Sequence, residues 1–178
     1  FAIFDGHAGQ QAAKWCGQNL HMLVEKKLIE KDAYDVREIL NDCFVDADYE
    51  IVRHCKGTRG CTAAVAVIRW EIQSDDGVSR NDDAEKDFRQ YLENHRRMLY
   101  TANVGDTRIV LYRNRQAMRL TYDHTASDKH EIARIESKGG IIMKSRVNGM
   151  LAVTRSLGDQ FFKDLVIGNP YTTSIELD

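Results

Sequence analysis

Four aspartates follow short apolar segments of the sequence, at points where a strand would end. Asp5 follows FAIF, Asp106 follows LYTANVG, Asp123 follows AMRLT and Asp159 follows LAVTRSLG. Carboxylate oxygens at the rim of a sheet are ligands that Mg²⁺ or Mn²⁺ prefers, and a flanking glycine lets a backbone carbonyl approach the ion. The pattern favours a divalent-metal site. Each aspartate taken alone is equally typical of a turn.

Other catalytic chemistries lack their motifs in this sequence. It contains no G-x-x-x-x-G-K-[ST] phosphate loop, no G-x-S-x-G elbow and no cysteine followed six positions later by arginine. His130-Glu131 begins like the zinc motif H-E-x-x-H, but Arg134 takes its last place. An aspartyl-phosphate enzyme usually carries a second carboxylate two residues after its nucleophile, and after Asp5 that place is taken by His7.

The composition is that of an ordinary globular domain. Of 178 residues, 43% are hydrophobic and 29% charged, and the formal net charge is −2. This balance argues against nucleic acid or an anionic membrane as a partner, and no apolar run is long enough to cross a bilayer. Four cysteines without a C-x-x-C pair predict reduced, mostly buried thiols of an intracellular protein. Because the chain starts at Phe1 inside a strand-like run, we expect a piece of a longer protein.

Hydrophobic periodicity predicts helices packed outside antiparallel sheets. We expect a short buried strand at 1–4, a helix at 8–30, a helix from Asp35 to the turn at 57–60, a strand buried on both faces at 61–72, a meander of strands at 98–104, 107–113 and 116–120, and a helix capped by Ser127 or Asp128 and stopped by Gly139-Gly140. Asp35 and Glu38 resemble a capping box. Residues 73–97 hold seven acids and five bases, which predicts a charged, flexible insertion.

Six motifs in a fixed order carry a family resemblance. They are FAIFDGHAG, GCTAAVAVI, LYTANVGDTRIVL, LTYDH, RIESKGGII and RVNGMLAVTRSLGD. Over nearly the whole chain apart from the insertion, they resemble the metal-dependent type 2C (PPM) serine/threonine protein phosphatases, and most of all the small fungal members of stress MAP kinase pathways. The resemblance implies an α+β fold, a four-layer α-β-β-α sandwich of two antiparallel sheets. It makes residues 1–178 a single partial catalytic domain with a flap-like segment at 128–148.

The resemblance also implies the reaction, which is hydrolysis of phosphoserine and phosphothreonine in proteins by a metal-bridged hydroxide. Two or three Mg²⁺ or Mn²⁺ ions would serve as cofactors. Asp5 would be the metal-bridging carboxylate, and Gly6 would offer its carbonyl to one ion. Asp106 would help to hold a third, weaker metal. His7 would protonate the leaving oxygen as general acid; the alternative for His7 is a loop histidine bonded to the backbone.

Further residues lie in the same motifs, and their interpretation is less specific. Basic residues of the flap-like segment, which could meet acidic or phosphorylated substrates but singly are typical of a solvated helix face, are Arg134, Lys138, Lys144 and Arg146. Interpreted as structural supports of the sheets are Thr62, Arg155 and Asp159. The pair Asp123-His124 is interpreted as a turn at the end of a strand.

The chain lacks three sequence motifs of the family it resembles. The upstream R-x-x-x-E-D motif and the downstream D-G-[LIV]-W-D and D-N motifs are absent. We therefore expect an active parent phosphatase but an inactive, weakly metal-binding chain with open sheet edges. A non-catalytic type 2C-like binding module remains an alternative, and so does an aspartyl-phosphate hydrolase using Asp5. The expected partners are phosphorylated proteins, among them a kinase, with no nucleic acid or membrane. We expect a monomer when complete, in the cytoplasm and nucleus.

Overall fold

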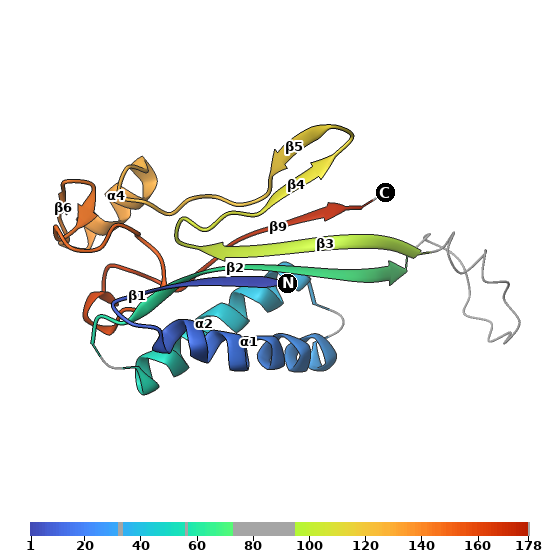
Figure 1. Cartoon of the computed structure of the whole chain (residues 1–178), viewed down its shortest axis with the longest axis horizontal. Coiled ribbons are helices and arrows are strands. Elements are labelled where there is room, and N and C mark those ends of the chain that lie inside the picture. The colour runs from blue at the N-terminus through green and yellow to red at the C-terminus, as the bar shows by residue number, and fades with distance from the viewer. Residues whose placement is uncertain (32–33, 56, 73–94, 178) are drawn as a thin grey trace, which may run out of the picture.

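The described part of the chain is built on one antiparallel sheet. A computed structural model describes residues 1–31, 34–55, 57–72 and 95–177. The sheet has the order β1-β2-β3-β9, and short β8 pairs with the start of β2. Its strands are β1 (Ala2–His7), β2 (Gly60–Ile72), β3 (His95–Val104), β8 (Leu157–Gly158) and β9 (Tyr171–Glu176). Helices α1 (Gln11–Glu30) and α2 (Val36–His54) lie together against one face of this sheet (Figure 1).

The core lies between the two helices and the sheet. The periodic face predicted for α2 is buried, from Val36 through Phe44 to Ile51, because residues three and four apart share one side of a helix. On α1 the buried positions are Ala12, Cys16, Leu20 and Val24, and Leu23 packs only partly buried beside them. All four cysteines are free and buried.

Side-chain caps fix where two helices begin. The Asp35 carboxylate accepts the backbone N–H of Arg37 at 2.8 Å and starts α2, as the sequence predicts. Of the two candidates for the third helix, Asp128 is the cap, and it accepts the N–H groups of His130 and Glu131. This helix, α4, spans Lys129–Ser137.

The predicted meander is wrong. Strands β4 (Val110–Arg113) and β5 (Gln116–Arg119) form a separate hairpin, which stands off the large sheet on the side opposite the helices (Figure 1). Asn114 and Arg115 both have positive φ, which suits a two-residue hairpin turn. The chain leaves the sheet at Gly105, whose φ is +84°. The place beside β3 that the prediction gives to β4 is taken by β9.

Two predictions of burial are also wrong. Residues 1–4 do not form a buried strand. Among the strands that the structure describes, β1 pairs with β2 alone and lies at the edge of the sheet, and Phe1 and Ile3 are 90% and 63% exposed. Strand β2 is buried on both faces only over residues 60–65, and its far half alternates between half-buried and exposed positions. Of the predicted insertion, residues 95–97 belong to β3, and residues 73–94 lie outside the described part of the chain.

A smaller second core lies at the end of the sheet where β1 ends (Figure 1). It joins α4 to the hairpin of β6 (Ile142–Met143) and β7 (Arg146–Val147) and to the short 3₁₀ helix η1 (Gln160–Phe162). Its buried members are Ile135, Val147, Phe162, Leu165 and Val166. None of the described helices combines the length and the hydrophobicity that crossing a lipid bilayer requires.

Candidate functional site

Strand register places the side chains of Asp5 and His7 on the same face of β1. Asp5 pairs with Thr62 of β2, and His7 pairs with Gly60. Alternate residues of a strand point to the same side. Cys61, one residue on from Gly60, faces the helices, because its sulfur lies 3.6 Å from that of Cys16 on α1. Asp5 and His7 therefore project from the face that the helices do not cover.

His7 is paired with Asp159, a residue far away in the sequence. The Nε2 atom of His7 lies 2.6 Å from Oδ2 of Asp159. The Asp159 side chain is completely buried, whereas the His7 side chain is 28% exposed. The pair thus joins a buried carboxylate to an imidazole that solvent reaches.

Gly60 makes room for this pair. It lies between His7 on β1 and Gly158 on β8, with which it is also in register. A Cβ atom at Gly60 would collide with the Asp159 carboxylate and would lie 2.6 Å from Nε2 of His7. Only a glycine lets the imidazole and the carboxylate meet above this point of β2.

The Asp159 carboxylate is held from several sides. Its Oδ2 also accepts the hydroxyl of Ser156, and its backbone N–H donates to the carbonyl of Arg59 at 2.9 Å. Asp159 has a φ of +53°, the left-handed region that aspartate adopts more readily than most residues. The second carboxylate oxygen, Oδ1, is buried and meets no hydrogen-bond donor within the described ranges.

Asp106 lies in a turn that packs against Thr62, the residue of β2 that pairs with Asp5. The turn at Gly105 packs so closely that a Cβ there would lie 2.5 Å from Cγ2 of Thr62. The hydroxyls of Thr62 and Thr107 are hydrogen-bonded. Thr62 pairs with Asp5 across β1 and β2, and it also contacts the turn that carries Asp106. These contacts agree with a supporting role for Thr62. Asp5 and Asp106 are both exposed.

These donors do not make a closed metal site on their own. Within the residues that the structure describes, no three histidine, cysteine, aspartate or glutamate side chains gather closely enough to hold a metal ion. Asp5, Gly6 and Asp106 offer the hard oxygen atoms that Mg²⁺ or Mn²⁺ prefers, but two carboxylates and one carbonyl do not fit a complete two-metal centre. Their metal-binding role remains a prediction.

Arg134 of the flap-like segment is engaged within the fold. It donates to the carbonyls of Leu165 and Thr154 and to the carboxylate of Glu131, which Arg155 also contacts. Burial opposes ionisation of Glu131, but the hydrogen bonds from the two arginines outweigh it and hold the pKa of this carboxyl at about 2. Arg134 and Arg155 are therefore structural. The other three basic residues that the sequence singles out in this segment are exposed: Lys138, Lys144 and Arg146.

The turn predicted at Asp123-His124 is wrong, because both residues lie in the irregular segment after β5 and the turn follows at 126–127. Asp123 forms ion pairs with Arg108 and Arg119 at the surface. His124 is buried, and its backbone N–H donates to the carbonyl of Gly105 at 2.9 Å. His124 thereby fastens the segment after β5 to the turn before Asp106.

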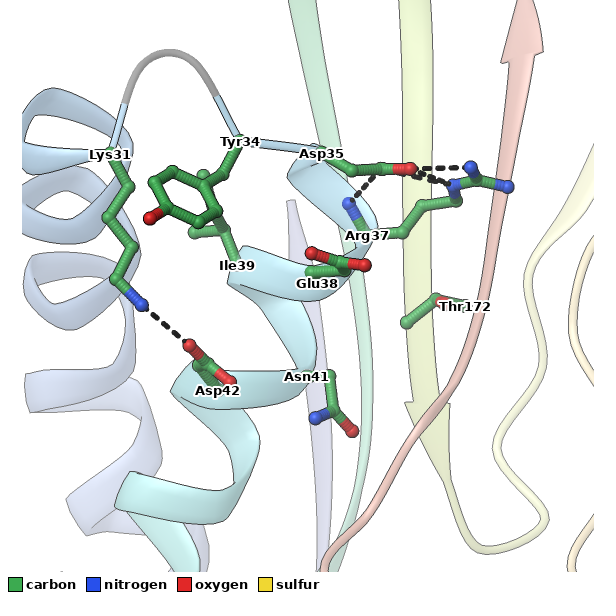
Figure 2. A pocket seen from close by; sticks show the side chains of 9 residues that line it. All are labelled: Lys31, Tyr34, Asp35, Arg37, Glu38, Ile39, Asn41, Asp42 and Thr172. Atoms are coloured by element: carbon green, nitrogen blue, oxygen red, sulfur yellow. Dashed lines mark hydrogen bonds and ion pairs between the residues drawn. The ribbon is translucent and has the colours of Figure 1, made fainter.

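A separate pocket of about 580 Å³ opens at the start of α2 (Figure 2). Two charged pairs line it, since Lys31 contacts Asp42 at 2.8 Å and Arg37 contacts Asp35. The start of α2 lies at the opposite end of the sheet from the end of β1 (Figure 1). The pocket is therefore distinct from the His7–Asp159 site.

Sequence reasoning missed two residues of the site. The sequence motifs predict only a structural support of the sheet at Asp159 and a helix-ending turn at Gly60. Asp159 is one of the four aspartates that follow an apolar segment, which was the available signal, but no spacing in the sequence links it to His7. The β1–β2 and β2–β8 registers create that contact.

Known proteins resemble the chain over its whole length. Residues 1–178 match the family Protein phosphatase 2C. The chain is 56% identical over 177 residues to Protein phosphatase 2C homolog 1 of Saccharomyces cerevisiae and 39% identical to the protein of that name in Schizosaccharomyces pombe. Each alignment covers 99% of this chain, but 60% of the first relative and 45% of the second. The chain thus spans about half the length of these relatives.

Solved structures share the fold. A sex-determining protein of C. elegans superposes with a TM-score of 0.76 at 24% identity, over 99% of this chain and 40% of that one. A phosphatase from Toxoplasma gondii gives 0.73 at 22% identity, over 98% of this chain and 58% of its own. These likenesses show the fold alone, and they confirm the predicted α+β class. With the match over residues 1–178, the predicted family is confirmed as well, and the chain belongs to the protein phosphatase 2C family.

Proposed function

We propose that the full-length protein hydrolyses phosphoserine and phosphothreonine in proteins and that it uses Mg²⁺ or Mn²⁺. Membership of the protein phosphatase 2C family supports the reaction class. One structural observation links the proposal to particular residues. Asp5 and His7 project from the same face of β1, and the turn that carries Asp106 packs beside them. That face joins hard oxygen donors to an imidazole, a combination that suits metal-assisted hydrolysis of a phosphate ester.

His7 is the proton donor in this proposal. A serine or threonine alkoxide is a strongly basic leaving group, so the bond to phosphorus breaks more easily when the oxygen receives a proton. A positioned imidazole typically accelerates such a step by about 10²–10⁴-fold. No step is assigned to Asp5, Gly6 or Asp106, because the described residues do not close a metal site.

Substrate, assembly and location are proposed more broadly. We infer that the substrates include a kinase of a stress MAP kinase pathway, since the motifs resemble those of the small fungal members. We further propose that the protein acts as a monomer in the cytoplasm and nucleus. The free cysteines and the near-neutral charge support an intracellular protein that does not bind nucleic acid.

Hydrolysis of a phosphothreonine peptide tests the proposal. The full-length protein is assayed with and without millimolar Mn²⁺ or Mg²⁺, beside Asp5→Asn and beside residues 1–178 alone. We expect metal-dependent turnover that Asp5→Asn abolishes and that residues 1–178 lack. A folded full-length protein without turnover would overturn the proposal and favour a non-catalytic binding module. A phosphoenzyme trapped on Asp5 would favour the aspartyl-phosphate mechanism.

A further inference from the structure

We propose that Asp159 is the positioning residue for His7, and that it holds the ring so that Nδ1 meets the leaving oxygen. The inference rests on the proposed function, in which His7 is the proton donor. It goes beyond that function because it assigns a residue of the S-L-G-D segment to the site and chooses between the two ring nitrogens.

The hydrogen bond decides which nitrogen is free. Nε2 of His7 is engaged by Oδ2 of Asp159 at 2.6 Å. A carboxylate that accepts from one ring nitrogen fixes both the tautomer and the orientation of the imidazole. Within the described part of the chain, Nδ1 has no hydrogen-bond partner. Nδ1 is therefore the nitrogen that can turn to a substrate oxygen.

Asp159 is rigid enough to act as a positioning residue. Its carboxylate is completely buried and also accepts from Ser156, while its backbone is bonded to Arg59. The preceding residue, Gly158, is paired into the sheet beside Gly60. An exposed ion pair lacks this support and stabilises little. The buried Asp159 carboxylate instead restricts the partly buried imidazole to one arrangement.

The competing interpretation is that His7 merely satisfies a buried carboxylate. The leaving group of the substrate separates the two roles. A phosphothreonine peptide releases an alkoxide that needs a proton, whereas 4-nitrophenyl phosphate releases a weakly basic phenolate that leaves without one. Loss of a correctly oriented imidazole slows only the first reaction. Loss of packing slows both reactions equally.

The experiment uses the full-length protein and four variants: Asp159→Asn, His7→Asn, the double variant, and Asp164→Asn. Asp164 is an exposed aspartate in the same loop, so Asp164→Asn is the matched control. For Asp159→Asn we expect kcat on the phosphothreonine peptide to fall roughly 10²-fold, near the lower end of a general-acid contribution. KM on the peptide and kcat on 4-nitrophenyl phosphate should stay within about threefold of the wild type.

The double variant shows whether the two residues act together. If Asp159 works through His7, the double variant is no slower than His7→Asn alone. Multiplied losses, or equal losses on both substrates, would overturn the inference. If His7→Asn loses peptide turnover selectively while Asp159→Asn does not, positioning by Asp159 is refuted and the proposed function survives. A wild-type protein without metal-dependent activity would refute both.

A second measurement needs no stable Asp159 variant. The ring-nitrogen NMR signals of His7 in the wild-type protein, assigned with His7→Asn, report the tautomer of the neutral imidazole. The inference expects the proton on Nε2, where it is donated to Asp159. A neutral ring that carries its proton on Nδ1 would overturn it.

Discussion

The Asp48 carboxylate on α2 accepts the backbone N–H of Gly158 at 2.8 Å. It therefore ties the helix layer to the turn that presents Asp159. Lys163, from the same turn, contacts Asp48 at 2.7 Å. Burial raises the pKa of the Asp48 carboxyl, although Lys163 and the Gly158 N–H both favour its charged form. Asp48 is thus a largely buried anchor for the loop behind the site.

Replacement of Asp48 by alanine should lower the free energy of unfolding by about 3 kcal/mol, because it leaves the Lys163 ammonium and the Gly158 N–H without their acceptor. Denaturant unfolding of the full-length protein measures the change. Asp46→Ala is the control, since Asp46 lies on the same helix and its side chain, which pairs with Lys27, is 53% exposed. The control should lose at most about 1 kcal/mol. Equal losses in the two variants would show that Asp48 is no anchor.

A Cβ at position 60 should be far more damaging than one at position 17. Gly60→Ala drives a methyl group into the Asp159 carboxylate and against His7, and we expect it to destabilise the protein by about 2 kcal/mol. Gly17 lies in α1 with no atom within 4 Å of an added Cβ. Gly17→Ala should therefore stabilise the protein by about 0.5–1 kcal/mol, because alanine favours the helix.

Thermal unfolding of both glycine variants checks this pair of expectations. The expected result is that Gly60→Ala lowers the melting temperature and Gly17→Ala raises it. A Gly60→Ala protein as stable as the wild type, with undiminished phosphopeptide turnover, would show that the His7–Asp159 contact does not need the space above Gly60.

Local features were predictable because neighbouring residues determine them. The periodic face of α2 and the cap at Asp128 follow from helix geometry and from the hydrogen bonds of the first turn. The alternation that places Asp5 and His7 on one face also follows from strand geometry alone. The family resemblance then supplied the fold class, since the motifs and their order are distinctive.

Long-range pairing was not predictable by the same means. Short connections suggested that β3 pairs with β4, but the turn at Gly105 directs the chain out of the sheet, and β9 pairs with β3. Nothing local to residues 1–4 reveals that β1 is an edge strand. The contact of His7 with Asp159 depends on two registers that meet at Gly60, and each register joins segments far apart in the sequence.

Glu131→Gln should destabilise the protein by about 3 kcal/mol, because it removes the charge that pairs with Arg134 and Arg155 while both remain largely buried. The pKa of Glu131 lies at about 2, below its ordinary value of 4.5. Its stabilising contribution is therefore complete above about pH 4.5 and is lost as the pH falls towards 2. Unfolding measured against pH tests this, with the exposed Glu136→Gln as control. A control that loses as much stability would contradict the expectation.

His124 should make the protein less stable as the pH falls from 6.5 to 4. Burial, reinforced by Arg155, lowers its pKa from 6.5 to about 4, although the nearby Glu131 favours the charged ring. The unfolded chain therefore takes up this proton near pH 6.5, whereas the folded chain does so only near pH 4. Acidification through that window favours unfolding by about 3 kcal/mol in total.

Urea unfolding of the full-length protein at several pH values measures this effect. His124→Gln should flatten the fall in stability between pH 6.5 and 4, since glutamine does not titrate. His21→Gln changes an exposed histidine of α1 and should keep the wild-type fall. The range above pH 4.5 avoids the titration of Glu131, so a remaining slope in His124→Gln equal to that of the wild type would refute the assignment to His124.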